Sequence, residues 1–289
     1  MKDYTVRAIS EDGLVRGFAA YTKDLVQELQ KRHQTTPLAS AALGRTATMG
    51  AIMGCMLKGE KDRVTIQVIG DGPLGAIRVD ANSQGDVRGM IDHPDVMLPL
   101  NASGKLDVAQ GVGQGNIYIL KDLGLREPYR GSSPIISGEL GDDFTYYFTA
   151  SEQVPSSVGL GVLVHNEQII AAGGYLLQVM PGASEETISQ LEKNIAKLES
   201  VTGLFVDGVT PEELLQRLMG EGTEILEQKP VQFRCHCSKE KTEEMLISLG
   251  REELLSLIEE QGQAEVICHF CNEKYLFTRT ELEQILAKL

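Results

Sequence analysis

Four of the five cysteines are grouped in two close pairs, and this grouping constrains the fold more than any other feature of the sequence. Cys235-His236-Cys237 is followed, after 30 intervening residues, by Cys268-His269-Phe270-Cys271. Two close pairs on separate turns can converge into a tetrahedral all-thiolate site, which suits zinc. The segment 231–289 has only 59 residues, so we expect a bound metal to support its small hydrophobic core. The sequence therefore predicts one zinc ion held by Cys235, Cys237, Cys268 and Cys271.

A closed four-cysteine site has two interpretations, which the spacing alone does not separate. In the first, zinc only stabilises a small domain, as in most closed sites of this kind. In the second, the site is a redox switch, because zinc keeps the thiols deprotonated until oxidation to disulfides removes the ligands. Metal release would then unfold the domain. The closeness of Cys235 to Cys237 favours local pairing, with Cys268 paired to Cys271.

Three further residues are candidate ligands or reactive groups. His236 and His269 lie inside the two cysteine pairs, but four cysteines already complete a tetrahedral site. We therefore expect these histidines to face solvent or to contact the ligands. Cys55 lies in a run of small residues and is expected to be a buried, inert thiol.

The charge distribution argues against nucleic-acid binding. The 289 residues include 27 basic and 41 acidic side chains, a net charge of −14. Residues 180–289 hold 11 of the basic and 21 of the acidic side chains. The main alternative, a zinc-ribbon nucleic-acid-binding protein, requires basic side chains to neutralise phosphates. Residues 231–289 instead hold 7 basic and 11 acidic side chains.

A second alternative is a zinc-dependent enzyme. Catalytic zinc keeps an open coordination position, whereas four cysteine ligands fill every position of a tetrahedral site. The sequence also contains no convincing pair of nucleophile and base, since Ser151-Glu152 and Ser156-Ser157 fit caps and turns better. We therefore expect a protein that is not an enzyme.

The sequence indicates neither export nor membrane insertion. Residues 1–18 carry charges throughout and lack the continuous apolar core of a secretory signal. The 12 uncharged residues from Thr46 to Leu57 are fewer than the about 20 that a spanning helix needs. The Gly50-x-x-x-Gly54 motif is instead expected to let another backbone pack against a buried helix. We predict a cytoplasmic protein, and cysteine clusters in the cytoplasm more often bind metal or sense redox state than form stable disulfides.

Residues 1–179 are predicted to form an α+β core domain with a mixed β-sheet. Val64, Ile66 and Val68 alternate with polar neighbours, which is the period of a half-buried strand. Helices are predicted at 23–33 and at 37–58, and the second is expected to be buried because it has almost no charged face. Strands are predicted near 4–9, 15–21, 64–68, 77–79, 86–91, 116–120, 144–149 and 158–164.

Residues 180–230 are predicted to be a helical linker, and 231–289 a small zinc-binding α+β domain. In the linker, apolar residues recur at helical spacing from Ile188 to Val201, and Thr210 with Glu213 forms a capping box for a helix ending near Met219. The final domain is predicted to contain helical residues 239–260 with a break at Gly250. A hairpin of 264–267 with 275–278 and a last helix with a Thr280–Glu283 capping box complete it.

The whole chain resembles the redox-regulated holdase chaperones of the heat shock protein 33 family, also called 33 kDa chaperonins. The two cysteine pairs fall where the zinc-binding thiols of that family belong. Four motifs of the core also match: Gly70-Asp71-Gly72-Pro73-Leu74-Gly75, Val87-Arg88-Gly89, Ser151-Glu152-Gln153-Val154-Pro155-Ser156 and Gly174-Tyr175-Leu176-Leu177-Gln178-Val179-Met180-Pro181.

The resemblance implies a stress-response function. The reduced, zinc-bound form would be inactive, and oxidants together with unfolding stress would form Cys235–Cys237 and Cys268–Cys271 disulfides. Zinc would leave, the end domain would unfold and the linker would loosen. The exposed apolar surface would then hold unfolding client proteins without ATP. The resemblance also implies an active homodimer and transfer of clients to ATP-dependent refolding chaperones.

Overall fold

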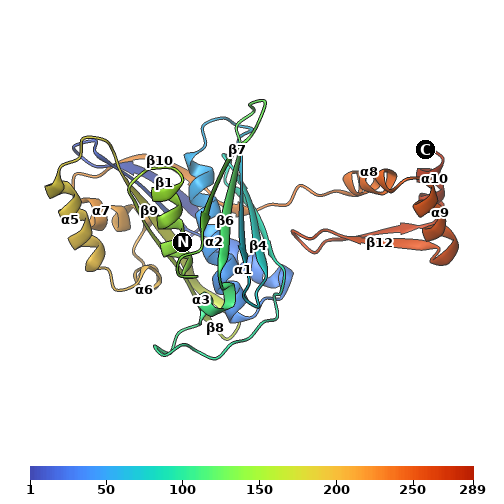
Figure 1. Cartoon of the computed structure of the whole chain (residues 1–289), viewed down its shortest axis with the longest axis horizontal. Coiled ribbons are helices and arrows are strands. Elements are labelled where there is room, and N and C mark those ends of the chain that lie inside the picture. Colours follow the sequence, from blue (N-terminus) through green and yellow to red (C-terminus); the bar gives the residue numbers. More distant parts are fainter. The chain divides into compact units, whose positions relative to one another are not determined.

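The computed structural model describes residues 1–289, which form two compact units, Met1–Arg234 and Cys235–Leu289. The first unit contains two large β-sheets and seven helices, and the second contains a two-stranded sheet and three helices (Figure 1). Strands and helices do not alternate regularly along the chain. The predicted α+β class is therefore confirmed.

The first sheet has five antiparallel strands in the order β10-β1-β2-β9-β8. Their bounds are β1 Tyr4–Ile9, β2 Val15–Tyr21, β8 Ser156–His165, β9 Gln168–Val179 and β10 Glu224–Pro230. Strand β9 is buried along most of its length, because helices cover both faces of this sheet. The strands predicted near 4–9, 15–21 and 158–164 are confirmed.

The second sheet has six strands in the order β11-β5-β4-β3-β6-β7. Their bounds are β3 Arg63–Gly70, β4 Ala76–Asn82, β5 Asp86–Ile91, β6 Gly115–Asp122, β7 Tyr129–Pro134 and β11 Gln232–Phe233. Strand β11 is parallel to β5 and the other pairs are antiparallel, so this sheet is mixed, as predicted. The alternating Val64, Ile66 and Val68 of β3 are all buried.

Helix α2, Pro37–Met56, packs against strands of both large sheets and forms the centre of the main core. Seventeen of its 20 residues are buried, which confirms the predicted buried helix. A Cβ atom on Gly50 would lie 2.7 Å from Val79 Cγ1, and one on Gly54 would lie 2.6 Å from the Asn82 carbonyl oxygen. The two glycines therefore let β4 approach the helix closely. Neither α2 nor any other helix qualifies as a membrane span.

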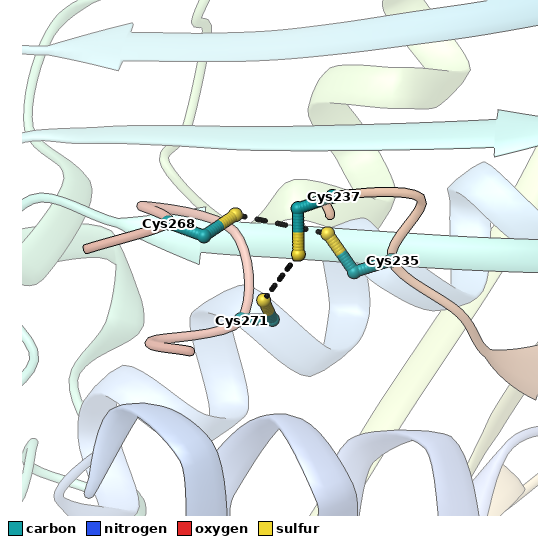
Figure 2. A group of neighbouring side chains, drawn as sticks. All are labelled: Cys235, Cys237, Cys268 and Cys271. Carbon is teal, nitrogen blue, oxygen red and sulfur yellow. Dashed lines mark hydrogen bonds between the residues drawn. The ribbon is translucent and has the colours of Figure 1, made fainter. Parts of the chain in front are cut away.

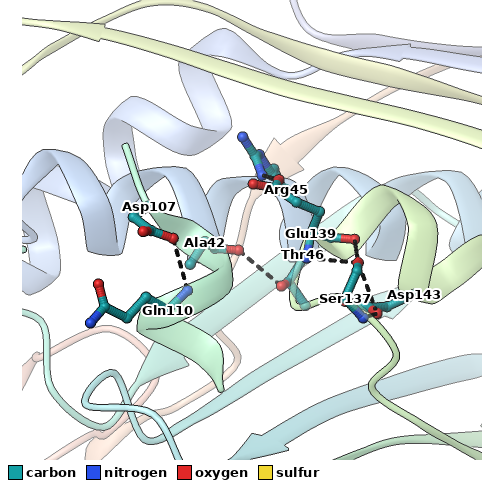
Figure 3. A network of polar contacts seen from close by, with 8 residues as sticks. All are labelled: Ala42, Arg45, Thr46, Asp107, Gln110, Ser137, Glu139 and Asp143. Carbon is teal, nitrogen blue, oxygen red and sulfur yellow. Dashed lines mark hydrogen bonds and ion pairs between the residues drawn. The ribbon is translucent and has the colours of Figure 1, made fainter. Parts of the chain in front are cut away.

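The segment predicted as a strand at 144–149 is instead part of a helix, and this prediction was wrong. Helix α4 spans Leu140–Ala150, and Phe144, Tyr147 and Phe148 are fully buried at helical spacing. Aromatic residues are common in strands, but burying all three on one side requires a helix. The Asp143 carboxylate accepts hydrogen bonds of 2.9 Å from the backbone N–H groups of Ile136 and Ser137 near the start of α4. Figure 3 shows the contact with Ser137.

The other helices of the first unit cover its sheets. Their bounds are α1 Lys23–His33, α3 Val108–Val112, α5 Glu185–Ala196, α6 Val201–Val206 and α7 Pro211–Met219. Leu191 of α5, Phe205 of α6 and Leu215 of α7 are buried with apolar residues of β1, β2 and β9. The Thr210–Glu213 capping box of α7 is present, as predicted.

The region predicted as a helical linker, 180–230, is not helical throughout. Its last seven residues form β10, which pairs with β1. This strand extends the edge of a sheet whose other strands lie far away in sequence, and such a partner cannot be recognised from a local pattern. The Tyr4 hydroxyl of β1 donates a 2.7 Å hydrogen bond to Glu212 of α7, and Gln228 of β10 donates to the same carboxylate.

The second unit contains α8 Lys239–Leu249, α9 Arg251–Glu260, β12 Gln263–Ile267, β13 Lys274–Thr278 and α10 Arg279–Leu286. Gly250 separates α8 from α9 and β12 pairs with β13, as predicted. The last capping box consists of Thr278 and Glu281, so the predicted pair of Thr280 and Glu283 was wrong. Both sequences fit the pattern, but β13 ends at Thr278 and the helix begins directly after it.

Candidate metal centre

The four cysteines of the two pairs come together in the second unit. Their sulfur atoms all lie within 4.8 Å of one another (Figure 2). Cys235 Sγ lies 3.7 Å from Cys268 Sγ, and Cys237 Sγ lies 3.3 Å from Cys271 Sγ. None of the four is in a disulfide. Each of these two contacts joins one cysteine of the first pair to one of the second, so they do not test the predicted pairing.

Local backbone structure positions the cysteines. Cys235 and Cys237 precede α8, where Ser238 caps the helix by accepting a hydrogen bond from the Lys241 N–H. Cys268 and Cys271 lie in the tight turn between β12 and β13. In that turn the Cys268 carbonyl oxygen accepts from the N–H groups of Cys271 and Asn272, at 3.2 and 2.7 Å. A helix start and a hairpin turn therefore present the two pairs to each other.

The spacing of the sulfurs fits a tetrahedral metal ion. A zinc–sulfur bond of about 2.3 Å places the corners of a tetrahedron about 3.8 Å apart. The measured 3.7 and 3.3 Å separations are close to that length. Backbone N–H groups of Phe270 and Glu273 also donate to the sulfurs of Cys268 and Cys271, as expected for orienting groups around metal ligands. Four thiolate donors at this spacing can hold one metal ion of the type that prefers sulfur.

The protein environment by itself disfavours charged thiolates at this site. Burial is the largest effect that raises the pKa values of the Cys268 and Cys271 thiols. The Cys235 sulfur also raises both pKa values, whereas the contact with Cys271 and the Phe270 N–H group lower that of Cys268. A bound cation would reverse this balance, since coordination keeps thiols deprotonated. Ionisation of the four cysteines is therefore linked to metal binding.

The histidines and the fifth cysteine are not members of the sulfur cluster. The cluster consists of four Sγ atoms and includes neither His236 nor His269. The His236 carbonyl oxygen accepts a 2.7 Å hydrogen bond from Lys241 Nζ. Cys55 is buried on α2, with 3% of its surface exposed, and burial raises its pKa. The expectation of a buried thiol at this position is confirmed.

Sequence reasoning missed one side chain at the site. The Tyr275 hydroxyl donates a 3.2 Å hydrogen bond to Cys237 Sγ. Tyr275 lies on β13, four positions after Cys271, in a segment that the sequence identified only as half of a hairpin. Tyr275 and Cys237 are far apart in the sequence, so the spacing of neighbouring residues could not predict this contact.

Comparisons with known proteins agree over nearly the whole chain. The family model described as "Hsp33 protein" matches residues 3–278. The 33 kDa chaperonin of Bacillus subtilis (strain 168) is 54% identical over 283 residues, which cover 97% of each chain. That of Staphylococcus aureus (strain JH9) is 52% identical over 290 residues, which cover 99% of each chain. The crystal structure of the 33 kDa chaperonin from Thermotoga maritima is 34% identical and has a TM-score of 0.93, covering 100% of this chain and 99% of that one.

Proposed function

Because the chain belongs to the Hsp33 family of chaperones, we propose that it is a redox-regulated holdase that protects unfolding proteins from aggregation without ATP. The reduced form with one bound zinc ion is inactive, and oxidation of the four clustered cysteines activates it. The observation that carries this proposal is the convergence of Cys235, Cys237, Cys268 and Cys271 within 4.8 Å in the smaller unit. In this proposal the protein acts as a binding protein and not as an enzyme.

Zinc is the metal that best suits the site. An all-sulfur tetrahedral set favours zinc or iron–sulfur centres, and a site closed by four cysteines from two separate turns is the common structural zinc arrangement. When bound, zinc would stabilise the thiolate form of all four sulfurs and so stabilise the fold of Cys235–Leu289. The small core of this unit supports such a role, because it contains only seven buried apolar side chains.

Oxidation of the thiolates removes the ligands. In the proposed reaction, four thiolates give four electrons to two molecules of hydrogen peroxide. Four protons are taken up, two disulfides form and four molecules of water leave. We propose the pairs Cys235–Cys237 and Cys268–Cys271, since the members of each pair are close in sequence and every sulfur lies within 4.8 Å of the others. Disulfide sulfurs are poor ligands, so oxidation releases the metal and unfolds the unit.

The chaperone surface is proposed to come from the segment 180–230. Leu191, Leu214 and Leu218 of this segment are buried against the five-stranded sheet. Its charge is unbalanced, with 4 basic and 10 acidic side chains, which favours solubility once it is released. Undocking of α5 to α7 would therefore expose apolar surface on a segment that remains soluble. Unfolding of the metal-binding unit is proposed to favour this undocking.

These assignments divide the chain by function. We propose a core domain at 1–179, a linker at 180–230 that responds to the switch, and a zinc redox-switch domain at 231–289. The active form is proposed to be a cytoplasmic homodimer. Its partners are unfolded or partly folded client proteins, which pass to ATP-dependent refolding chaperones after reduction.

Zinc release and chaperone activity must rise together if the cysteine cluster is the switch. Reduced, zinc-loaded protein is treated with hydrogen peroxide while a chromogenic chelator reports free zinc. Samples taken during the reaction are tested for suppression of the aggregation of a heat-denatured enzyme. We expect both signals to increase in parallel and to reverse after reduction with added zinc. Oxidised protein that retains zinc, or that loses zinc without suppressing aggregation, would rule out the proposed switch.

A further inference from the structure

We propose that the Tyr275 hydroxyl restrains the oxidation of Cys237 and strengthens metal binding by donating a hydrogen bond to its sulfur. The inference rests on the proposed redox function and assigns a residue outside the four cysteines to the control of that reaction. The distance from Tyr275 Oη to Cys237 Sγ is 3.2 Å, within the range of a hydrogen bond to sulfur. Tyr275 would therefore set how readily the switch responds to an oxidant.

The hairpin holds this hydroxyl in place. Tyr275 pairs with Val266 across β12 and β13, and its half-buried ring packs against the small core of the unit. Phe277, two positions along the same strand, points to the same side and is buried in that core with 1% of its surface exposed. The tyrosine ring is therefore supported by the packed hairpin, and the position of its hydroxyl does not depend on a mobile side chain.

Tyr275 differs from the other sulfur donors in its chemistry. The N–H groups of Phe270 and Glu273, which donate to Cys268 and Cys271, belong to the backbone of the turn. The donor to Cys237 is a side-chain hydroxyl. Substitution by phenylalanine removes the hydroxyl and keeps the ring, so this hydrogen bond can be tested without changing the turn.

The expected effect follows from the electron density on the sulfur. A hydrogen bond donated to a thiolate draws electron density away from the sulfur and makes it a weaker nucleophile. Oxidation begins when the Cys237 thiolate attacks one peroxide oxygen, giving a sulfenic acid and hydroxide. A second thiolate then displaces hydroxide to form the disulfide, and the two hydroxide ions take up two protons. Loss of the donor should accelerate the first step by about threefold, the scale on which thiolate reactivity follows the electron density at sulfur.

The same hydrogen bond should also affect metal affinity. Groups that hydrogen-bond to metal ligands orient them, and their removal commonly reduces affinity by about 10- to 100-fold. We expect Tyr275→Phe to bind zinc about 10-fold more weakly than the unmodified protein. The variant should still fold with saturating zinc, because the four ligands and the ring are retained.

The test compares full-length, zinc-loaded Tyr275→Phe with the unmodified protein and with Tyr118→Phe. Tyr118 lies on β6 in the other unit and is 43% exposed, so Tyr118→Phe controls for the loss of one phenol group. Zinc affinity is measured by competition with a chelator. Oxidation by dilute peroxide is followed with a sulfenic-acid trap, and fragment mass spectra give the initial rate at each cysteine.

We expect about threefold faster trapping at Cys237 in Tyr275→Phe, with smaller changes at the other three cysteines and none in Tyr118→Phe. Equal acceleration at all four cysteines would show a general loosening of the unit and would overturn the inference. Unchanged or slower reaction at Cys237 would overturn it as well. Failure of the unmodified protein to release zinc under peroxide would instead contradict the proposed function, so the two failures are distinguishable.

Discussion

The two compact units of the molecule are stabilised in different ways. The main core of Met1–Arg234 contains 36 buried apolar side chains, arranged around α2 and lined by strands of both large sheets. The core of Cys235–Leu289 contains seven, together with four thiols grouped within 4.8 Å. Burial of apolar surface can stabilise the first unit alone, whereas a unit as small as the second commonly requires a metal or crosslinks. A change in cysteine chemistry should therefore unfold Cys235–Leu289 and leave the main core of the first unit folded.

The segment that joins these units is anchored within the first. Phe233 lies under the Arg32 guanidinium, 4.6 Å from its carbon to the ring centroid. Gln232 donates a 2.8 Å hydrogen bond to the buried Asp86 carboxylate. The anchored residues lie just before Cys235 in the chain. Unfolding that begins in the second unit can therefore stop at this point.

Removal of the metal should have the largest effect. A chelator added to reduced protein is expected to unfold Cys235–Leu289, because the binding of structural zinc contributes about 10 kcal/mol or more to the folding of such units. Hydrogen exchange should show lost protection in α9 and β13 and retained protection in β3 and β9. Cys268→Ser should weaken zinc binding and leave a partly active protein. Unaltered zinc affinity in that variant would contradict its assignment as a ligand.

Matched leucine substitutions should distinguish the two cores. Leu43 of the main core and Leu254 of the small core are both fully buried, and each change to alanine should cost about 3 kcal/mol. If metal binding and folding of the small unit are one equilibrium, Leu254→Ala should weaken zinc binding by about 100-fold. Leu43→Ala should lower the stability of the first unit and leave zinc affinity unchanged. Equal zinc affinities in the two variants would contradict a metal-dependent fold.

Acidification should affect the two units in opposite directions. Burial raises the pKa of the Asp3 carboxyl from 3.8 to about 6, so the folded first unit binds this proton more tightly than the unfolded chain does. The contribution of Asp3 to stability is therefore complete below pH 4 and is lost as the pH rises to about 6, by roughly 3 kcal/mol. In the second unit, protons compete with the metal for thiolates, so acid weakens metal binding.

Urea unfolding of the first unit between pH 4 and 7 tests the Asp3 contribution. As the pH rises through this range, the unfolding free energy of the unmodified protein should fall relative to that of Asp3→Asn. Exposed Asp95 provides the control, because Asp95→Asn should leave the pH dependence unchanged. A pH dependence that persists unaltered in Asp3→Asn would exclude this carboxyl as its source.

The smallest predicted effect concerns the docking of α7. Glu212 accepts hydrogen bonds from Tyr4 and Gln228, so Glu212→Gln replaces one acceptor with a donor and should cost about 1 kcal/mol. Amide exchange in α7 should become about fivefold faster, with a modest rise in chaperone activity before oxidation. Glu192→Gln on exposed α5 surface is the matched control. If both variants exchange alike, the Glu212 contacts do not hold α7 in place.

Local patterns were sufficient where structure depends on neighbours in sequence. The alternation of Val64, Ile66 and Val68 identified β3, because burial of one face imposes a period of two on a strand. The near absence of charge in α2 identified a helix that is buried on all sides. The four clustered cysteines were also recognisable from spacing alone.

Distant partners explain what the sequence could not predict. Strand β10 exists because β1 offers a free sheet edge more than 200 positions away in sequence. The aromatic residues of α4 suggested a strand, and only the surrounding core requires them on one face of a helix. The Tyr275 contact to Cys237 joins residues 38 positions apart and depends on how the hairpin packs.

Hydrogen exchange of zinc-loaded protein before and after peroxide treatment is the most direct test of the proposed switch. It shows whether the cysteine cluster stabilises the fold of Cys235–Leu289 and not that of Met1–Arg234. Zinc release is followed on the same samples. We expect peptides from Cys235–Leu289 to lose protection as zinc is released, while β3, β4 and β9 retain theirs and reduction with added zinc restores the original pattern. Full protection of Cys235–Leu289 after complete zinc loss would contradict a metal-held switch, as would simultaneous unfolding of the central strands.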